Sequence, residues 1–173
     1  GPYSSLFKRA VPECHMVHLV RDAIDTALEV SEKGWLSDEE LSHPNNPLPY
    51  REYTLVSGDR TVALPCWVEG GFEEQYLSYS DFGRGLYYWR RMASQEDIRK
   101  AGFSDSQYVM VKYQDLIEHP AKTFGVLQTR LKVTATDQTD LLISGLTKQQ
   151  PHEVPDGLPS GSDLAEIPAI RSA

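Results

Sequence analysis

The sequence contains little cysteine, no long apolar run and less positive than negative charge. Its two cysteines, Cys14 and Cys66, exclude a disulfide framework, although one bridge between them is compatible with the sequence. No apolar run approaches the roughly 20 residues that a membrane-spanning helix needs. The net charge of -8 argues against nucleic-acid binding, because that affinity depends on neutralising phosphates. An anionic small ligand is still compatible, since one well-placed arginine can bind it locally.

Two further signals are missing from the sequence. The histidines and cysteines show no spacing typical of metal ligands. No signal peptide is visible, but the opening Gly1-Pro2 is typical of the remnant of a cleaved tag, so the first residues say nothing about the compartment. Localisation and oligomeric state are therefore left open.

The most informative feature is an apolar run at residues 16–20 that ends in Arg21 and Asp22. Such a run predicts a parallel strand covered on both faces, with His18 as a satisfied core histidine. The strand would deliver Arg21 to the carboxyl edge of the sheet, where α/β proteins bind ligands. An amphipathic helix is predicted to follow, from about Ala23 to Lys33, and to stop at Gly34.

The rest of the chain alternates between helical and extended patterns. Residues 37–71 are predicted to form an insertion or substrate loop, with two short strands around the turn at 57–59. The aromatic spacing of residues 72–92 predicts a long helix, broken or kinked at Gly83 and Gly85, whose aromatic stripe packs in the core. A second strand at 108–113 and a helix opened by Pro120 follow. Order is expected to fade from Val133.

These patterns predict an α/β fold. Residues 1–148 would form one partial domain, and residues 149–173, with Pro151, Pro155, Pro159 and Pro168, an extended or mobile tail.

Three parts of the sequence, at residues 12–22, at Trp89 and at residues 112–120, occur in an order and spacing typical of one family. Together they resemble the sulfotransferases, which use phosphoadenosine phosphosulfate (PAPS) as sulfuryl donor. Residues 12–22 (PECHMVHLVRD) resemble the segment that binds the 3′-phosphate of the donor. Residues 112–116 (KYQDL), followed by His119-Pro120, resemble the family's Tyr-Glu-Asp-Leu stretch, and Trp89 falls between the two. The resemblance implies a three-layer parallel sheet of the P-loop nucleotide-kinase-like type. It would be incomplete at the N-terminal side, because the phosphosulfate-binding loop expected before the first strand is absent.

The resemblance also implies a donor site. Arg21 would bind the 3′-phosphate, which an arginine fork can hold through two oxygens at once. Tyr113 would lie near the adenosine. The family has a serine eight residues after the arginine, but this chain has Glu29, which would repel a phosphate; Thr26, one turn earlier, is the candidate substitute.

Each assignment has a structural alternative. Arg21 would otherwise pair with Asp22, Asp25 or another carboxylate at the rim of the sheet, and Tyr113 would be a core tyrosine closing its strand.

The function implied is transfer of a sulfuryl group from PAPS to a hydroxyl or amine acceptor, leaving phosphoadenosine phosphate (PAP). Residues 36–92 would shape the acceptor pocket. No histidine can be assigned as the catalytic base, which in the family comes from an upstream segment. The chain would need that N-terminal half, in the same polypeptide or as a companion chain. The alternatives are a degenerate, non-catalytic sulfotransferase-like module that binds a partner and, less favoured, another nucleotide-using α/β enzyme such as a small kinase.

Overall fold

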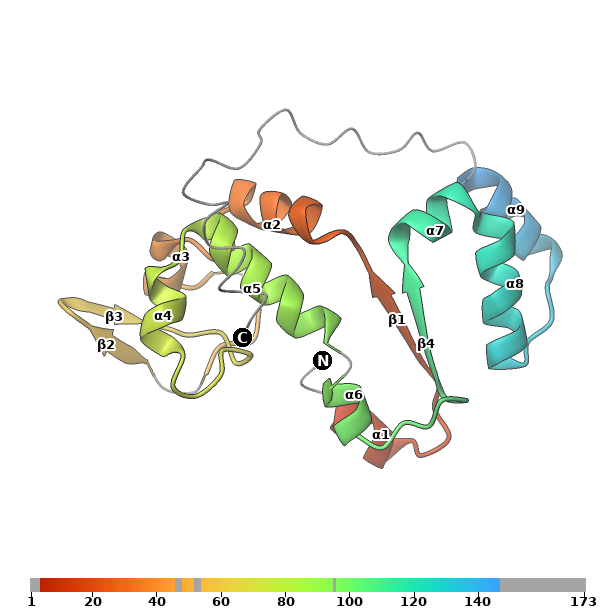
Figure 1. Cartoon of the computed structure of the whole chain (residues 1–173), viewed down its shortest axis with the longest axis horizontal. Helices are drawn as coiled ribbons and strands as arrows, with labels where there is room; N and C mark the ends of the chain where they lie inside the picture. The colour runs from red at the N-terminus through yellow and green to blue at the C-terminus, as the bar shows by residue number, and fades with distance from the viewer. Residues whose placement is uncertain (1–3, 46–47, 52–53, 95, 147–173) are drawn as a thin grey trace. The chain divides into compact units, whose positions relative to one another are not determined.

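The computed structural model describes residues 4–45, 48–51, 54–94 and 96–146 (Figure 1). The predicted tail at 149–173 lies outside them. The described chain divides into two compact units, the first made of residues 4–22 and 93–146 and the second of residues 23–92.

A small parallel sheet organises the first unit. Strand β1 (Met16–Val20) pairs with β4 (Tyr108–Lys112), and their register aligns Met16 with Tyr108 and Val20 with Lys112. Both predicted strands and a mixed α/β fold with parallel pairing are thus confirmed. The helices of this unit are α1 (Ser4–Ala10), α6 (Glu96–Lys100), α7 (Tyr113–Glu118), α8 (Pro120–Leu131) and α9 (Asp137–Leu146).

Two expectations for this unit are wrong. Order does not fade from Val133, because α9 follows. The strand at 16–20 is not covered on both faces either: Val17 is 44% exposed and Leu19 51%. Both lie on the sheet face that carries Val111, because paired residues of parallel strands point the same way. Only Val111 is buried there, at 6% exposure. This face of β1 is therefore largely open in the described part of the chain.

The second unit contains most of the described core. Helices α2 (Ala23–Glu32), α3 (Asp38–Ser42), α4 (Glu73–Ser78) and α5 (Asp81–Ala93) accompany the antiparallel hairpin of β2 (Leu55–Ser57) and β3 (Arg60–Val62). Residues 37–71, predicted as an insertion or substrate loop, contribute buried Leu41, Val62, Leu64 and Trp67. The aromatic stripe of residues 72–92 packs as predicted, with Tyr76, Phe82 and Leu86 buried.

A buried arginine joins the helices of the second unit. Arg84 is 3% exposed, and its guanidinium donates hydrogen bonds to the Asp38 (2.6 Å) and Asp81 (3.3 Å) carboxylates. It also donates to three backbone carbonyl oxygens, those of Leu36 (2.9 Å), Leu77 (2.8 Å) and Tyr76 (3.4 Å). The cost of burying this cation is thus offset by hydrogen-bond acceptors in α3, in α4 and in the chain before α3.

The predicted break in the long helix is misplaced. The helix is interrupted at Tyr79 and Ser80, between α4 and α5. The Oγ of Ser80 accepts a hydrogen bond from the Gly83 N–H at 3.1 Å, as the side chain of an N-cap residue does. Gly85 lies inside α5, where the close approach of α2 leaves no space for a side chain. A Cβ atom at this position would lie 2.9 Å from both the Cα and the carbonyl oxygen of Ala27 in α2.

Gly85→Ala is therefore expected to destabilise the second unit by about 1–3 kcal/mol, because neither contacting atom belongs to a flexible side chain. Urea unfolding followed by tryptophan fluorescence measures it, since Trp35, Trp67 and Trp89 all belong to this unit. Gly125→Ala in α8 is the matched control: no atom lies within 4 Å of the added Cβ, and a gain of up to about 1 kcal/mol by circular dichroism is expected. A stabilised Gly85→Ala would contradict the close packing of α2 on α5.

Candidate functional site

Arg21 and Tyr113 meet at the carboxyl edge of the parallel sheet. Because Val20 and Lys112 are aligned in the register, the residues that follow them emerge at the same edge. The Arg21 guanidinium carbon lies 5.9 Å from the centroid of the Tyr113 ring, within the range of a cation–π contact. The structure thus brings together two of the three residues predicted for the donor site.

Arg21 and Tyr113 are both intermediate in burial. Tyr113 is the first residue of α7, which has no fully buried residue, and its ring is half-buried. Arg21 is also half-buried and leaves β1 before the second unit begins. Tyr113 is therefore not enclosed in a core, and its ring flanks the arginine.

The third predicted residue, Thr26, lies in α2 of the second unit, together with Glu29. The Glu29 carboxylate pairs with Lys33 Nζ at 2.5 Å, one helical turn further on. Both side chains are partly exposed, at 41% and 46%. The pair offsets the charge of Glu29 locally, and the roles of Thr26 and Glu29 at a donor site stay predictions.

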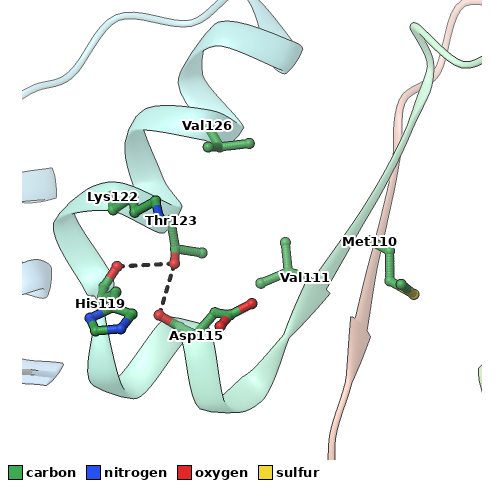
Figure 2. A pocket seen from close by; sticks show the side chains of 7 residues that line it. All are labelled: Met110, Val111, Asp115, His119, Lys122, Thr123 and Val126. Carbon is green, nitrogen blue, oxygen red and sulfur yellow. Dashed lines mark hydrogen bonds between the residues drawn. The ribbon is translucent and has the colours of Figure 1, made fainter.

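A small hollow lies between β4 and helices α7 and α8 (Figure 2). Its volume is about 170 Å³, and it is lined by Met110, Val111, Asp115, His119, Lys122, Thr123 and Val126. The Thr123 hydroxyl donates to the backbone carbonyls of Asp115 (2.8 Å) and His119 (3.0 Å). These bonds tie α8 to α7, so the hydroxyl is not poised as a nucleophile. The hollow is smaller than the several hundred Å³ typical of ligand sites, and a nucleotide would not fit in it.

His18 makes a hydrogen bond within the first unit, as predicted, but it is half-buried and not part of the core. Its Nδ1 lies 3.0 Å from the Tyr108 hydroxyl on the neighbouring strand. Burial raises the pKa of Tyr108, against an opposing effect of Arg99, so the phenol stays protonated in neutral solution. This pair holds the two strands together and contributes no base near Arg21.

Comparisons with family models, curated proteins and solved structures find no match for this chain. Within the part of the chain that the structure describes, no group of three or more His, Cys, Asp or Glu residues is arranged to hold a metal ion. No helix among the described residues is long and apolar enough to cross a membrane.

Proposed function

We propose that this chain is part of a sulfotransferase and that Arg21 binds the 3′-phosphate of PAPS. The observation that carries the proposal is the meeting of Arg21 and Tyr113 at the carboxyl edge of a parallel strand pair. Ligands of open α/β sheets bind at that edge. The reaction would transfer the sulfuryl group to a hydroxyl or amine acceptor and release PAP.

The chemistry of the two side chains suits a nucleotide that carries a 3′-phosphate. A guanidinium has five N–H donors, and a phosphate can accept two of them in parallel. Contact with the Tyr113 ring restricts the arginine rotamers, which lowers the entropy lost when a ligand binds. The half-buried ring of Tyr113 also offers an aromatic surface to an adenine.

The exposed apolar side chains of the parallel sheet support the proposal that a further segment completes the domain. Val17, Leu19 and Met110 are each more than two-fifths exposed, although parallel sheets are normally buried on both faces. We propose that the N-terminal half, in the same polypeptide or in a companion chain, adds strands to this sheet and that the helices connecting those strands cover its faces. That half would also supply the phosphosulfate loop and the catalytic base.

Glu29 favours the second candidate function, a degenerate sulfotransferase-like module that binds a partner without catalysing transfer. The family places a serine here, which would donate a hydrogen bond to the phosphate. A carboxylate accepts hydrogen bonds only and repels the dianion. For such a module, the ion pair with Lys33 would stabilise the charge of Glu29 in α2.

Calorimetric titration of PAP into the native chain and into Glu29→Ser tests the proposal and separates the two functions. We expect the native chain to bind PAP and Glu29→Ser to bind it about five- to tenfold more tightly, because a repulsive charge is replaced by a donor. Glu32→Ser is the matched control: it removes one carboxylate from the same helix and is expected to change the affinity less than about twofold.

The other outcomes decide between the candidates. Binding that occurs only with Glu29→Ser would identify a decayed donor site and favour the partner-binding module. If neither protein binds PAP, the donor site assigned to Arg21 is wrong for this chain.

A further inference from the structure

A second hollow lies in the first unit, at the sheet edge opposite Arg21. His15 precedes β1 and Gln107 precedes β4, so both residues mark the edge at which the two parallel strands begin. The Met16 N–H donates to the Gln107 carbonyl at 2.7 Å and closes this edge. Five residues of strand separate it from Arg21, a distance of about 16 Å.

The hollow is large and is built from several distant segments of the chain. Its volume of about 610 Å³ falls within the range of small-molecule sites. Its walls come from α1, the segment before β1, the turn before β4 and the end of α8. The lining residues are Lys8, Pro12, Glu13, His15, Ser104, Ser106, Gln107, Thr129, Arg130 and Lys132.

The charge of this hollow is opposite to that of the chain. Three cations, Lys8, Arg130 and Lys132, face one carboxylate, that of Glu13, in a protein whose net charge is -8. Arg130 and Lys132 belong to the end of α8, where the helix dipole also favours cations. Lys8 comes from the last turn of α1, where the dipole of that helix has the same effect, but neither dipole by itself brings the ends of the two helices to one hollow.

Donors are available in the hollow after its internal hydrogen bonds are counted. Lys8 Nζ donates to the Pro12 carbonyl at 2.5 Å and to Gln107 Oε1 at 2.6 Å, and it lies 5.2 Å from the centroid of the Phe103 ring. One of its three N–H groups makes no hydrogen bond to these two acceptors. Arg130 makes one long bond, 3.5 Å, to the Asp105 carbonyl and has further N–H groups. The Ser104 hydroxyl donates to Gln107 Oε1 at 3.2 Å, so the neutral donor of the hollow is the hydroxyl of Ser106, 3.0 Å from that of Ser104.

We infer that this hollow binds a small organic phosphate or sulfate. Ammonium, guanidinium and hydroxyl donors reach it from different segments, which suits a tetrahedral anion better than a planar carboxylate. The volume exceeds what one inorganic anion fills, so the ligand carries an organic body beside its charged group. The site lies away from Arg21 and is independent of the proposed donor site.

The test uses ¹H–¹⁵N correlation spectra of the native chain, titrated with pyrophosphate to about 10 mM at constant ionic strength, a range that saturates sites with Kd near 1 mM. We expect saturable shifts at the Gln107 and Thr129 amides. Glucose 6-phosphate and glucose 6-sulfate, with glucose as the neutral control, show which ester is preferred. Saturable shifts with either ester support the inference, and an absence of saturable shifts with all three anions overturns it.

Matched variants assign the binding to the hollow. Arg130→Gln is expected to raise the Kd for pyrophosphate at least about fivefold. Lys122→Gln removes one positive charge from an exposed position of the same helix and is expected to leave the Kd within about twofold. Equal losses in the two variants would mean that only overall charge matters, and would overturn the inference. Arg21→Ala is expected to leave these shifts unchanged, so failure of either site is distinguishable from failure of the other.

Discussion

Arg84→Met is expected to lower the free energy of unfolding of the second unit by about 2–4 kcal/mol. Methionine fills a similar volume but donates no hydrogen bond. The carboxylates of Asp38 and Asp81 would lose a counterion, but they are 56% and 39% exposed and stay hydrated. The buried carbonyls of Leu36, Leu77 and Tyr76 would lose their donor. Leaving such acceptors unpaired in the interior costs more than the interaction itself contributes. Because small domains are stable by only about 5–15 kcal/mol, this loss would leave the unit marginal.

Urea unfolding followed by tryptophan fluorescence measures this effect. Arg60→Met is the control, because Arg60 contacts the same Asp38 carboxylate at 2.7 Å but is 42% exposed. Its loss is expected to cost less than about 1 kcal/mol. Arg84→Lys, which keeps the charge but not the fork, is expected to fall between the two and provides a measurement if the methionine variant does not fold. Equal effects of Arg84→Met and Arg60→Met would show that burial of the cation is not what stabilises the unit.

The second large effect concerns the proposed donor site. Arg21→Ala is expected to weaken PAP binding about a hundredfold, which corresponds to about 2.8 kcal/mol. The variant removes the charged donor, while the half-exposed position at the end of β1 tolerates a smaller side chain. Tyr113→Leu is expected to weaken binding only about three- to tenfold, because it removes the aromatic contact and leaves the cation in place.

Calorimetric titration of PAP measures both variants. Arg9→Ala is the control, since Arg9 is an exposed arginine in α1 of the same unit. It is expected to leave the affinity within about twofold. A loss with Arg9→Ala as large as with Arg21→Ala would indicate nonspecific attraction of the nucleotide to positive charge.

The sequence predicted the strands of the first unit because their signal is local. Each is a short apolar run with a charged or polar boundary, and the helices that follow begin with recognisable residues such as Pro120. The parallel pairing followed from the order of strands and helices. Exposure of Val17 and Leu19 could not be predicted, because an apolar run does not tell whether another layer of the structure packs on each face of its strand.

The misplaced helix break has a signal that could have been read. Ser80 before Asp81 is a typical N-cap, and it marks the start of α5 more directly than the glycines do. Helix α9 gave little signal because none of its residues is fully buried, and its sequence includes Ser144 and Gly145 near the end.

The two ligand sites differ in how far the sequence can indicate them. Arg21 and Tyr113 each stand directly after a strand, so the sheet edge that they share follows from the strand order. The basic hollow gathers Lys8, Ser104 and Arg130 from segments that are far apart in the chain. No spacing rule connects these residues, and only the folded structure shows that they face one another.

The comparison of PAP with adenosine 5′-monophosphate tests the central claim most directly. The two nucleotides differ in the 3′-phosphate, so the ratio of their dissociation constants isolates the group that Arg21 is proposed to hold. In the native chain we expect PAP to bind about a hundredfold more tightly, and in Arg21→Ala we expect the ratio to fall close to one. A ratio that is unchanged in Arg21→Ala would contradict the assignment of Arg21 to the 3′-phosphate and, with it, the donor site at the carboxyl edge of the sheet.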